Sequence, residues 1–286
     1  MQSHDILMQR SGEYNYIKCL SCGSIYQSPV PSQEILLSYY QPDYPVHVSK
    51  KQGFQKQMMI GARYGYIKKR RIVEKYIKKG SILDVGCARG DFLVEMKTAG
   101  WSVIGLEPIS SAAQAAKAKG LDILQTTLDE IDISFQQFDV VTLWDVLEHV
   151  PDPYSILRII HKILKPYGIA IFSTPNASSM DARIFGQYWI GYDPPRHVCI
   201  FTRKSLTNAL QLAGFRIIQS LNLSGTQSYF QTSLDIMVRR VLGPKIGDSL
   251  MFALASIPGR ILTALPFYVY GLARMGTTLT VVVCKS

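Results

Sequence analysis

From residue 80 onward the sequence alternates between short apolar segments and segments with helical spacing, and this alternation constrains the fold more than any other feature. Glycines such as Gly100, Gly120 and Gly214 punctuate the alternation. Strands that alternate with helices build a parallel, doubly wound sheet. The expected strands are residues 82–85, 103–106, 121–124, 138–143, 168–173, 215–218 and 278–284, and the expected helices are residues 91–99, 110–119, 154–164 and 205–213.

The fold class that this pattern predicts is α/β, with a doubly wound, Rossmann-like sheet of seven strands and an apolar helical insertion before the last strand. In open sheets of this kind, ligands bind beyond the carboxyl ends of the strands, where the strand order reverses. We therefore expect the functional residues just after the first, second, fourth and fifth strands.

The first strand leads into a turn that contains Gly86 and Gly90 and is followed by a helix. Glycines there allow a tight turn and a close approach of ligand to backbone, and the free N–H groups of a helix N-terminus favour a carboxylate or phosphate. The dinucleotide motif G-x-G-x-x-G has a different spacing. Glu107, at the end of the second strand, is placed to accept hydrogen bonds from both ribose hydroxyls of a nucleoside; the alternative is a solvated turn residue.

The segment 138–150, FDVVTLWDVLEHV, narrows the choice of ligand. Together with the turn at residues 84–90 and the LKPYG segment at 164–168, it resembles the class I S-adenosylmethionine-dependent methyltransferases, in particular the ubiquinone-type O-methyltransferase group, over residues 80–222. The resemblance implies S-adenosylmethionine as the cofactor. This chain has Ala88 where the family usually has glycine, which narrows the turn. The cofactor-binding residues that the resemblance implies are Asp84, Gly86, Ala88, Gly90, Glu107, Pro108, Thr127, Leu128, Trp144 and Asp145.

Two histidines are candidates for the catalytic base that a hydroxyl acceptor requires. His149 follows the fourth strand, and His197 lies in a loop beyond the fifth strand that two consecutive prolines stiffen. A positioned base typically contributes about 10²–10⁴-fold to a rate. The alternatives are structural: His149 shapes a turn, or His197 bonds to backbone. The predicted acceptor-binding residues are Tyr192, Asp193 and Arg196, of which the last two would orient the base or bind an anionic acceptor.

The remaining segments divide the chain. We predict an irregular N-terminal segment over residues 1–48, a basic helical segment over 49–79, and a methyltransferase domain over 80–286 with an apolar insertion at about 224–276. Within the insertion, the apolar stretch 250–273 contains Arg260 and two prolines, which favour two short helices over a membrane span. These helices would form either a buried lid or dimer surface, or an interfacial anchor and apolar wall for a lipid-linked acceptor.

Cys19 and Cys22 resemble one half of a zinc ribbon. Structural zinc normally takes four ligands, and a second cysteine pair is missing upstream of the catalytic domain; His4 is a candidate third ligand. We therefore favour a degenerate ribbon and predict no bound metal.

The net charge of +10 favours anionic partners, and the stretch between Lys50 and Lys79 concentrates basic residues against one acid, Glu74. An anionic membrane surface or a phosphate-bearing acceptor would use this charge; the alternative is a solvated basic surface. Five scattered cysteines and an N-terminus without a signal peptide predict a cytoplasmic protein, free or membrane-associated.

The function that these features predict is transfer of a methyl group from S-adenosylmethionine to oxygen on a small molecule, a lipid or a glycan precursor. The first alternative is a non-catalytic binding module with a methyltransferase-like fold, at a membrane or partner surface. The second is a nucleic-acid methyltransferase, which charge alone supports. The identity of the acceptor, the choice among oxygen, carbon and nitrogen, and the oligomeric state stay open.

Overall fold

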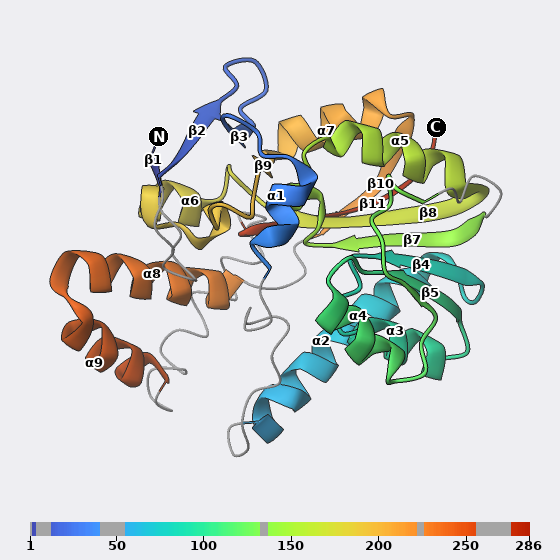
Figure 1. Ribbon diagram of the computed structural model, residues 1–286, viewed down its shortest axis with the longest axis horizontal. Coiled ribbons are helices and arrows are strands. Elements are labelled where there is room, and N and C mark those ends of the chain that lie inside the picture. The colour runs from blue at the N-terminus through green and yellow to red at the C-terminus, as the bar shows by residue number, and fades with distance from the viewer. Residues whose placement is uncertain (1, 4–12, 41–54, 132–136, 222–225, 256–275) are drawn as a thin grey trace.

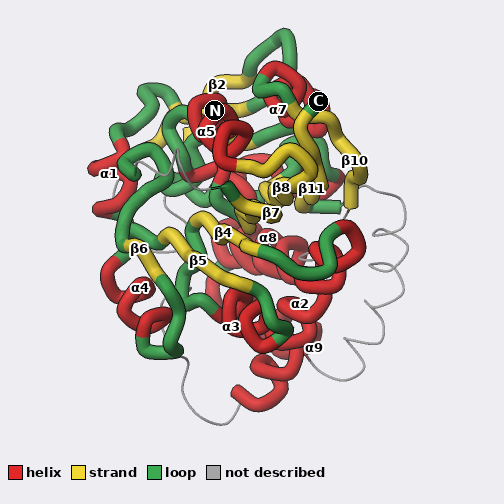
Figure 2. Tube along the Cα trace, turned by 90° about the vertical axis from the view of Figure 1, so that its right-hand side faces the viewer, coloured by secondary structure: helices red, strands yellow, loops and turns green. Residues whose placement is uncertain are grey.

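The computed structural model describes residues 2–3, 13–40, 55–131, 137–221, 226–255 and 276–286. Its centre is a seven-stranded sheet with the strand order β10-β11-β8-β7-β4-β5-β6 (Figures 1 and 2). The predicted α/β fold with seven strands is confirmed. The strands are β4 (Ser81–Val85), β5 (Ser102–Leu106), β6 (Ile123–Leu124), β7 (Phe138–Trp144), β8 (Leu164–Pro175), β10 (Phe215–Leu221) and β11 (Thr278–Lys285).

Strand direction is the one point at which the sheet differs from the parallel arrangement that we predict. β4, β5, β6, β7 and β8 are parallel to one another, whereas β11 lies antiparallel to β8 on one side and to β10 on the other. An apolar strand pattern gives burial on both faces but does not give direction, so the orientation of β11 is not readable from its sequence.

Helices cover both faces of the sheet, and each face has its own core (Figure 1). One core contains Leu157 and Ile160 of α5 (Pro153–Ile163) and Leu206 of α7 (Arg203–Leu212). The other contains residues of α2 (Gln55–Tyr76), α3 (Asp91–Thr98) and α4 (Ser110–Lys117). Full burial of one such aliphatic side chain contributes about 1.5–3 kcal/mol, so these helices fix the strand ends firmly.

The N-terminal segment is more regular than the sequence predicts. β1 (Gln2–Ser3), β2 (Tyr14–Lys18), β3 (Ile25–Gln27) and β9 (Cys199–Ile200) form a second sheet in the order β1-β2-β3-β9, and α1 (Gln33–Ser38) follows β3. Ile25 pairs with Ile200, and Tyr26 with Cys199. The strands are short and one of them lies far along the chain, so local patterning gives no sign of this sheet. It attaches the N-terminal segment to the loop beyond β8.

The basic and apolar segments are described in part. The basic stretch forms α2, but Lys50 and Lys51 lie outside the described residues, as does His4. The insertion begins with α8 (Thr226–Leu242) and α9 (Pro244–Ala255), and residues 256–275 of the apolar stretch also lie outside the described part. A search of the described helices finds none with the length and hydropathy of a membrane span.

The turn after β4 holds three residues in the left-handed region: Gly86 with φ of 68°, Ala88 with φ of 49° and Gly90 with φ of 73°. A Cβ atom at Gly86 would lie 2.6 Å from Cγ2 of Val146, and one at Gly90 would lie 2.4 Å from Cδ1 of Leu121. Both glycines are therefore required by conformation and by packing. Ala88 adopts a conformation that costs an L-residue with a Cβ atom about 1–2 kcal/mol.

Replacing Ala88 by glycine is expected to stabilise the protein by about 0.5–1 kcal/mol, because the relief of strain exceeds the added entropy of the unfolded chain. Urea unfolding measures the change. The control is Ala115→Gly within α4, where φ is helical and glycine costs about 1 kcal/mol. Equal destabilisation by the two substitutions would contradict strain at Ala88.

Candidate active site

A cavity of about 560 Å³ opens at the carboxyl ends of β4, β5, β6 and β7. Its position is the one that the strand order predicts. After β4 the chain adds β5 and β6 on one side, and it then continues with β7 on the other side of β4, so the strand order reverses there. Of the residues predicted from sequence, those on its wall are Gly86, Ala88, Glu107, Pro108, Thr127, Leu128, Trp144, Asp145, His149, Asp193 and His197.

The Glu107 carboxylate links the ends of two neighbouring strands. One oxygen accepts a hydrogen bond of 2.9 Å from the backbone N–H of Ala88, and the other accepts one of 2.9 Å from Ile109. Burial raises the pKa of Glu107, while these two hydrogen bonds lower it. A carboxylate has about four lone-pair sites, so both oxygens keep acceptor capacity toward the cavity.

Two polar groups on the cavity wall have no hydrogen-bond partner among the residues that the structure describes: the Thr127 hydroxyl and the Trp144 indole N–H. Buried polar groups in folded proteins are nearly always paired, so these two are open to a polar ligand. The Trp144 ring is fixed from both sides. Phe92 packs edge-on at 5.6 Å between centroids, and Nζ of Lys69 lies 4.4 Å from the ring centroid. Lys69 was not singled out from the sequence, because it is one of many basic residues in its helix.

Asp84 and Gly90, also predicted as cofactor-binding residues, support the turn and do not lie on the cavity wall. Asp84 is buried and accepts a hydrogen bond of 2.6 Å from the Thr142 hydroxyl. Burial raises the pKa of Asp84 to about 7, against the lowering effects of Thr142 and Lys69. Gly90 precedes α3 and packs against α4 and Leu121.

Because the pKa of Asp84 is higher in the folded state, folding takes up a proton between the unfolded and folded pKa values. The contribution of Asp84 is most favourable below about pH 4 and is lost as the pH rises to about 7, by up to about 4 kcal/mol. The Asp84→Asn variant does not titrate there, so its stability relative to wild type should rise from pH 4 to pH 8. Urea unfolding across this range measures the difference; a constant difference would contradict the raised pKa.

The other end of the cavity carries His149 and His197, whose rings meet edge to face with centroids 4.5 Å apart. Nδ1 of His149 lies 3.0 Å from the carbonyl oxygen of Arg196 and 2.7 Å from the Tyr40 hydroxyl. Nδ1 of His197 lies 2.8 Å from the carbonyl oxygen of Gly191. Burial lowers the pKa of both histidines, so both are neutral at pH 7. The backbone contact predicted as a structural alternative for His197 is present, on the ring nitrogen opposite Nε2.

Two of the three predicted acceptor-binding residues do not lie on the cavity wall. Arg196 is fully buried, and its guanidinium donates two hydrogen bonds to the Asp193 carboxylate, at 2.9 Å and 2.6 Å. Tyr192 is buried against Trp189. Asp193 does line the cavity. The sequence predicts that these residues belong to the loop beyond β8, but it does not indicate that the Arg196 side chain points into the protein and away from the cavity.

Sequence analysis missed a wall of the cavity that comes from the N-terminal segment. Leu36, Leu37 and Tyr40, on and just after α1, line it beside the histidines. The hydroxyl of Tyr16 in β2 donates to the carbonyl oxygens of Tyr192 and His197. These contacts join residues more than 100 positions apart, and no local sequence signal announces them.

Cys19 and Cys22 lie in a turn between β2 and β3, where Sγ of Cys22 is 3.0 Å from the Ser24 hydroxyl. Burial raises the pKa of Cys199 in β9, and the proximity of Cys22 raises it further. Within the described ranges, no group of three or more ligand atoms includes this pair. That the pair is a degenerate zinc ribbon without bound metal stays a prediction.

Comparison with known proteins shows which family the chain resembles. A family model described as a methyltransferase domain matches residues 63–220, which is more than half of the chain. The chain is 40% identical over 106 residues to a ubiquinone biosynthesis O-methyltransferase of Actinobacillus pleuropneumoniae, over 33% of this chain and 45% of that protein. The matched region thus spans less than half of the length of this curated relative.

Solved structures show the same fold at low sequence identity. Magnesium protoporphyrin IX methyltransferase from Synechocystis PCC 6803, with bound S-adenosylhomocysteine, superimposes with a TM-score of 0.58 at 13% identity, over 89% of this chain and all of that one. The 1,6-didemethyltoxoflavin N1-methyltransferase of Burkholderia thailandensis gives a TM-score of 0.54 at 16% identity, over 96% and 99% of the two chains.

The sheet order and the cavity at its strand ends define a class I methyltransferase. The chain belongs to the methyltransferase-domain family.

Proposed function

We propose that this methyltransferase transfers the methyl group to an oxygen atom of a small or lipid-linked acceptor. The observation that carries the proposal is the division of a single cavity into two chemically different ends. Glu107, Thr127 and Trp144 offer hydrogen-bonding groups at one end, and a pair of neutral histidines faces the other.

The first end suits the cofactor. Glu107 would accept from the ribose hydroxyls, and Thr127, Leu128 and Pro108 would lie around the adenine. The turn at Gly86 and Ala88, followed by the N-terminus of α3, would hold the methionine part, and Trp144 and Asp145 would flank it. Unpaired Thr127 and Trp144 groups, together with a turn too tight for a Cβ atom at residue 86, support this assignment.

The second end suits an acceptor that is apolar apart from a hydroxyl. Leu36, Leu37 and Ile190 bring aliphatic side chains to the wall near the histidines. With Nδ1 of each histidine close to a carbonyl oxygen, which can only accept, Nδ1 carries the proton and Nε2 presents a lone pair. An acceptor hydroxyl facing Nε2 would give up its proton there as its oxygen bonds to the methyl carbon, the carbon–sulfur bond breaks and S-adenosylhomocysteine leaves. When bound, S-adenosylmethionine supplies that electrophilic methyl group on its sulfonium.

A lipid-linked acceptor draws support from the insertion. Tyr229 and Thr232 of α8 line the cavity. Further along α8 and on α9, Leu242, Ile246 and Phe252 are exposed, the last with 82% of its surface accessible. α8 therefore runs from the cavity wall to an exposed apolar surface that it shares with α9, which is the arrangement expected where an acceptor keeps an apolar tail outside. The name of the O-methyltransferase relatives supports oxygen as the acceptor atom.

Replacing Glu107 by alanine is expected to weaken S-adenosylmethionine binding about 10–100-fold, because it removes charge-assisted hydrogen bonds worth about 1.5–3 kcal/mol. Isothermal titration calorimetry measures the affinity. Asp122→Ala, an exposed acid just before β6, is the matched control and should bind as wild type does. Unchanged affinity in a folded Glu107→Ala protein would remove Glu107 from the cofactor site.

Replacing His197 by alanine is expected to lower methyl transfer about 10²–10⁴-fold while cofactor affinity stays within a few-fold of wild type. Mass spectrometry of extract components that gain a labelled methyl group identifies the acceptor and gives the rate. His161→Ala is the control, since His161 lies on α5 and packs against Phe215. Normal turnover by His197→Ala would exclude His197 from the reaction.

A further inference from the structure

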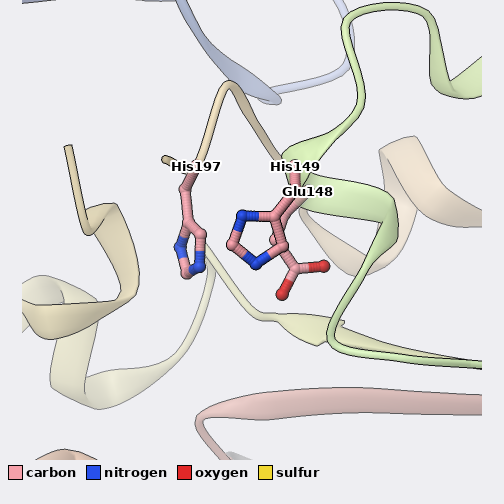
Figure 3. A group of neighbouring side chains, drawn as sticks. All are labelled: Glu148, His149 and His197. Atoms are coloured by element: carbon pink, nitrogen blue, oxygen red, sulfur yellow. The ribbon is translucent and has the colours of Figure 1, made fainter. Parts of the chain in front are cut away.

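Glu148, His149 and His197 form a cluster at the acceptor end of the cavity (Figure 3). Glu148 and His149 belong to the short 3-10 turn η1 (Leu147–His149), and His197 comes from the loop before β9. One potential ligand atom from each residue lies within 4.8 Å of the other two. Among the described residues this is the one group of three or more such side chains with this spacing.

Glu148 is the unusual member. Its side chain is fully buried, and neither carboxylate oxygen has a hydrogen-bond partner within the described part of the chain. Burial raises the pKa of Glu148 well above its usual range, and the nearby Thr174 hydroxyl lowers it; that hydroxyl has no hydrogen-bond partner among the described residues. An isolated buried carboxylate costs several kcal/mol unless a cation or a proton neutralises it. The folded chain therefore holds an acceptor group beside the two histidines that nothing in the described structure satisfies.

The histidines are oriented as metal ligands usually are. The carbonyl oxygens of Arg196 and Gly191 accept from Nδ1 of His149 and His197, which leaves both Nε2 atoms with free lone pairs. Metal-binding histidines almost always donate their other ring N–H in this way, because it fixes the tautomer and the ring orientation. The carboxylates of Asp145 and Asp193 also raise the pKa of Glu148, and the charge of Asp193 is itself paired with the buried Arg196.

We propose that Glu148, His149 and His197 bind a divalent transition-metal ion, with Zn²⁺ as the best match. Two imidazoles and one carboxylate with an open fourth position are a ligand set of catalytic zinc sites. Tetrahedral zinc with ligands at about 2.1 Å places the ligand atoms about 3.4 Å apart. Since the three atoms already lie within 4.8 Å of one another, movements of the side chains by about 1 Å would bring them into contact with the ion. The open position faces the cavity, since His149 and His197 are both part of its wall.

The consequence for the reaction rests on the proposed function. An acceptor hydroxyl bound at the open position would lose its proton to solvent more readily, because a metal ion lowers the pKa of the oxygen that it binds. With the ion bound, the histidine Nε2 atoms would be its ligands and would not take the proton. The oxyanion would form its bond to the methyl carbon as the carbon–sulfur bond of the sulfonium breaks, and S-adenosylhomocysteine would leave as the neutral thioether. Binding of the ion itself requires no acceptor and no cofactor, so it is tested independently of methyl transfer.

The test uses the full chain in a Cys19→Ser/Cys22→Ser background, which removes the other candidate zinc ligands. Zinc chloride is titrated calorimetrically into protein stripped with a chelator. About one equivalent of zinc is expected to bind. Glu148→Gln and His197→Asn should each weaken binding about 100-fold or more, because replacing a residue that only hydrogen-bonds to a metal ligand already lowers metal affinity about 10–100-fold. His161→Asn is the matched control and should bind as the background protein does.

Cobalt provides a second readout in the chain that retains both cysteines. A nitrogen and oxygen ligand set gives visible d–d bands without the near-ultraviolet charge-transfer band of a thiolate, and the d–d bands should disappear in Glu148→Gln. Calorimetric binding of S-adenosylhomocysteine checks that each variant is folded; if Glu148→Gln fails this check, His197→Asn decides. Absence of zinc binding in the background protein, or equal affinity in it and the folded cluster variants, would overturn the proposal. Zinc binding without any O-methylated product would instead overturn the proposed function alone.

Discussion

The buried ion pair between Asp193 and Arg196 is the interaction on which the acceptor end of the cavity depends. Its two hydrogen bonds hold the loop beyond β8 in one conformation, and the main chain of that loop then positions both histidines. The carbonyl oxygen of Arg196 accepts from His149, and His197 follows Arg196 directly. Removing one partner of a buried pair costs about 3–5 kcal/mol because it leaves the other charge unpaired. The arginine therefore acts on the chemistry through the backbone.

The loop is also held from outside by the N-terminal sheet. β3 pairs with β9, and the Tyr16 hydroxyl donates to two carbonyl oxygens of the loop. Burial raises the pKa of Tyr16, which keeps the hydroxyl protonated and able to donate. Because Tyr40 reaches the Nδ1 side of His149 from the same N-terminal segment, the segment both supports the loop and contributes to the wall. It is part of the site in structural terms, although it lies outside the Rossmann-like sheet.

Sequence reasoning found the parts of the molecule whose signals are local. The strands and the turn after β4 follow from apolar runs and glycine positions, and Glu107 follows from its place at a strand end. Three features were beyond it for physical reasons. The pairing of β3 with β9 joins residues about 170 positions apart, the inward direction of Arg196 depends on its partner Asp193, and the isolation of Glu148 depends on what surrounds it in space. The spacing of apolar residues in the sequence indicates which side chains are buried. It does not indicate which buried polar groups lack a hydrogen-bond partner.

This difference separates what family membership determines from what it leaves open. The family match covers residues 63–220, which contain the strand ends and the groups assigned to the cofactor. Leu36, Leu37 and Tyr40 precede that region, and Tyr229 and Thr232 follow it, yet all five line the same cavity. The acceptor end is thus built from the region that the family model matches, which contains His149 and His197, and from segments on either side of it. A common sheet can hold one methyl donor while the segments added on either side of it determine which molecule receives the methyl group, so the acceptor has to be sought through these segments.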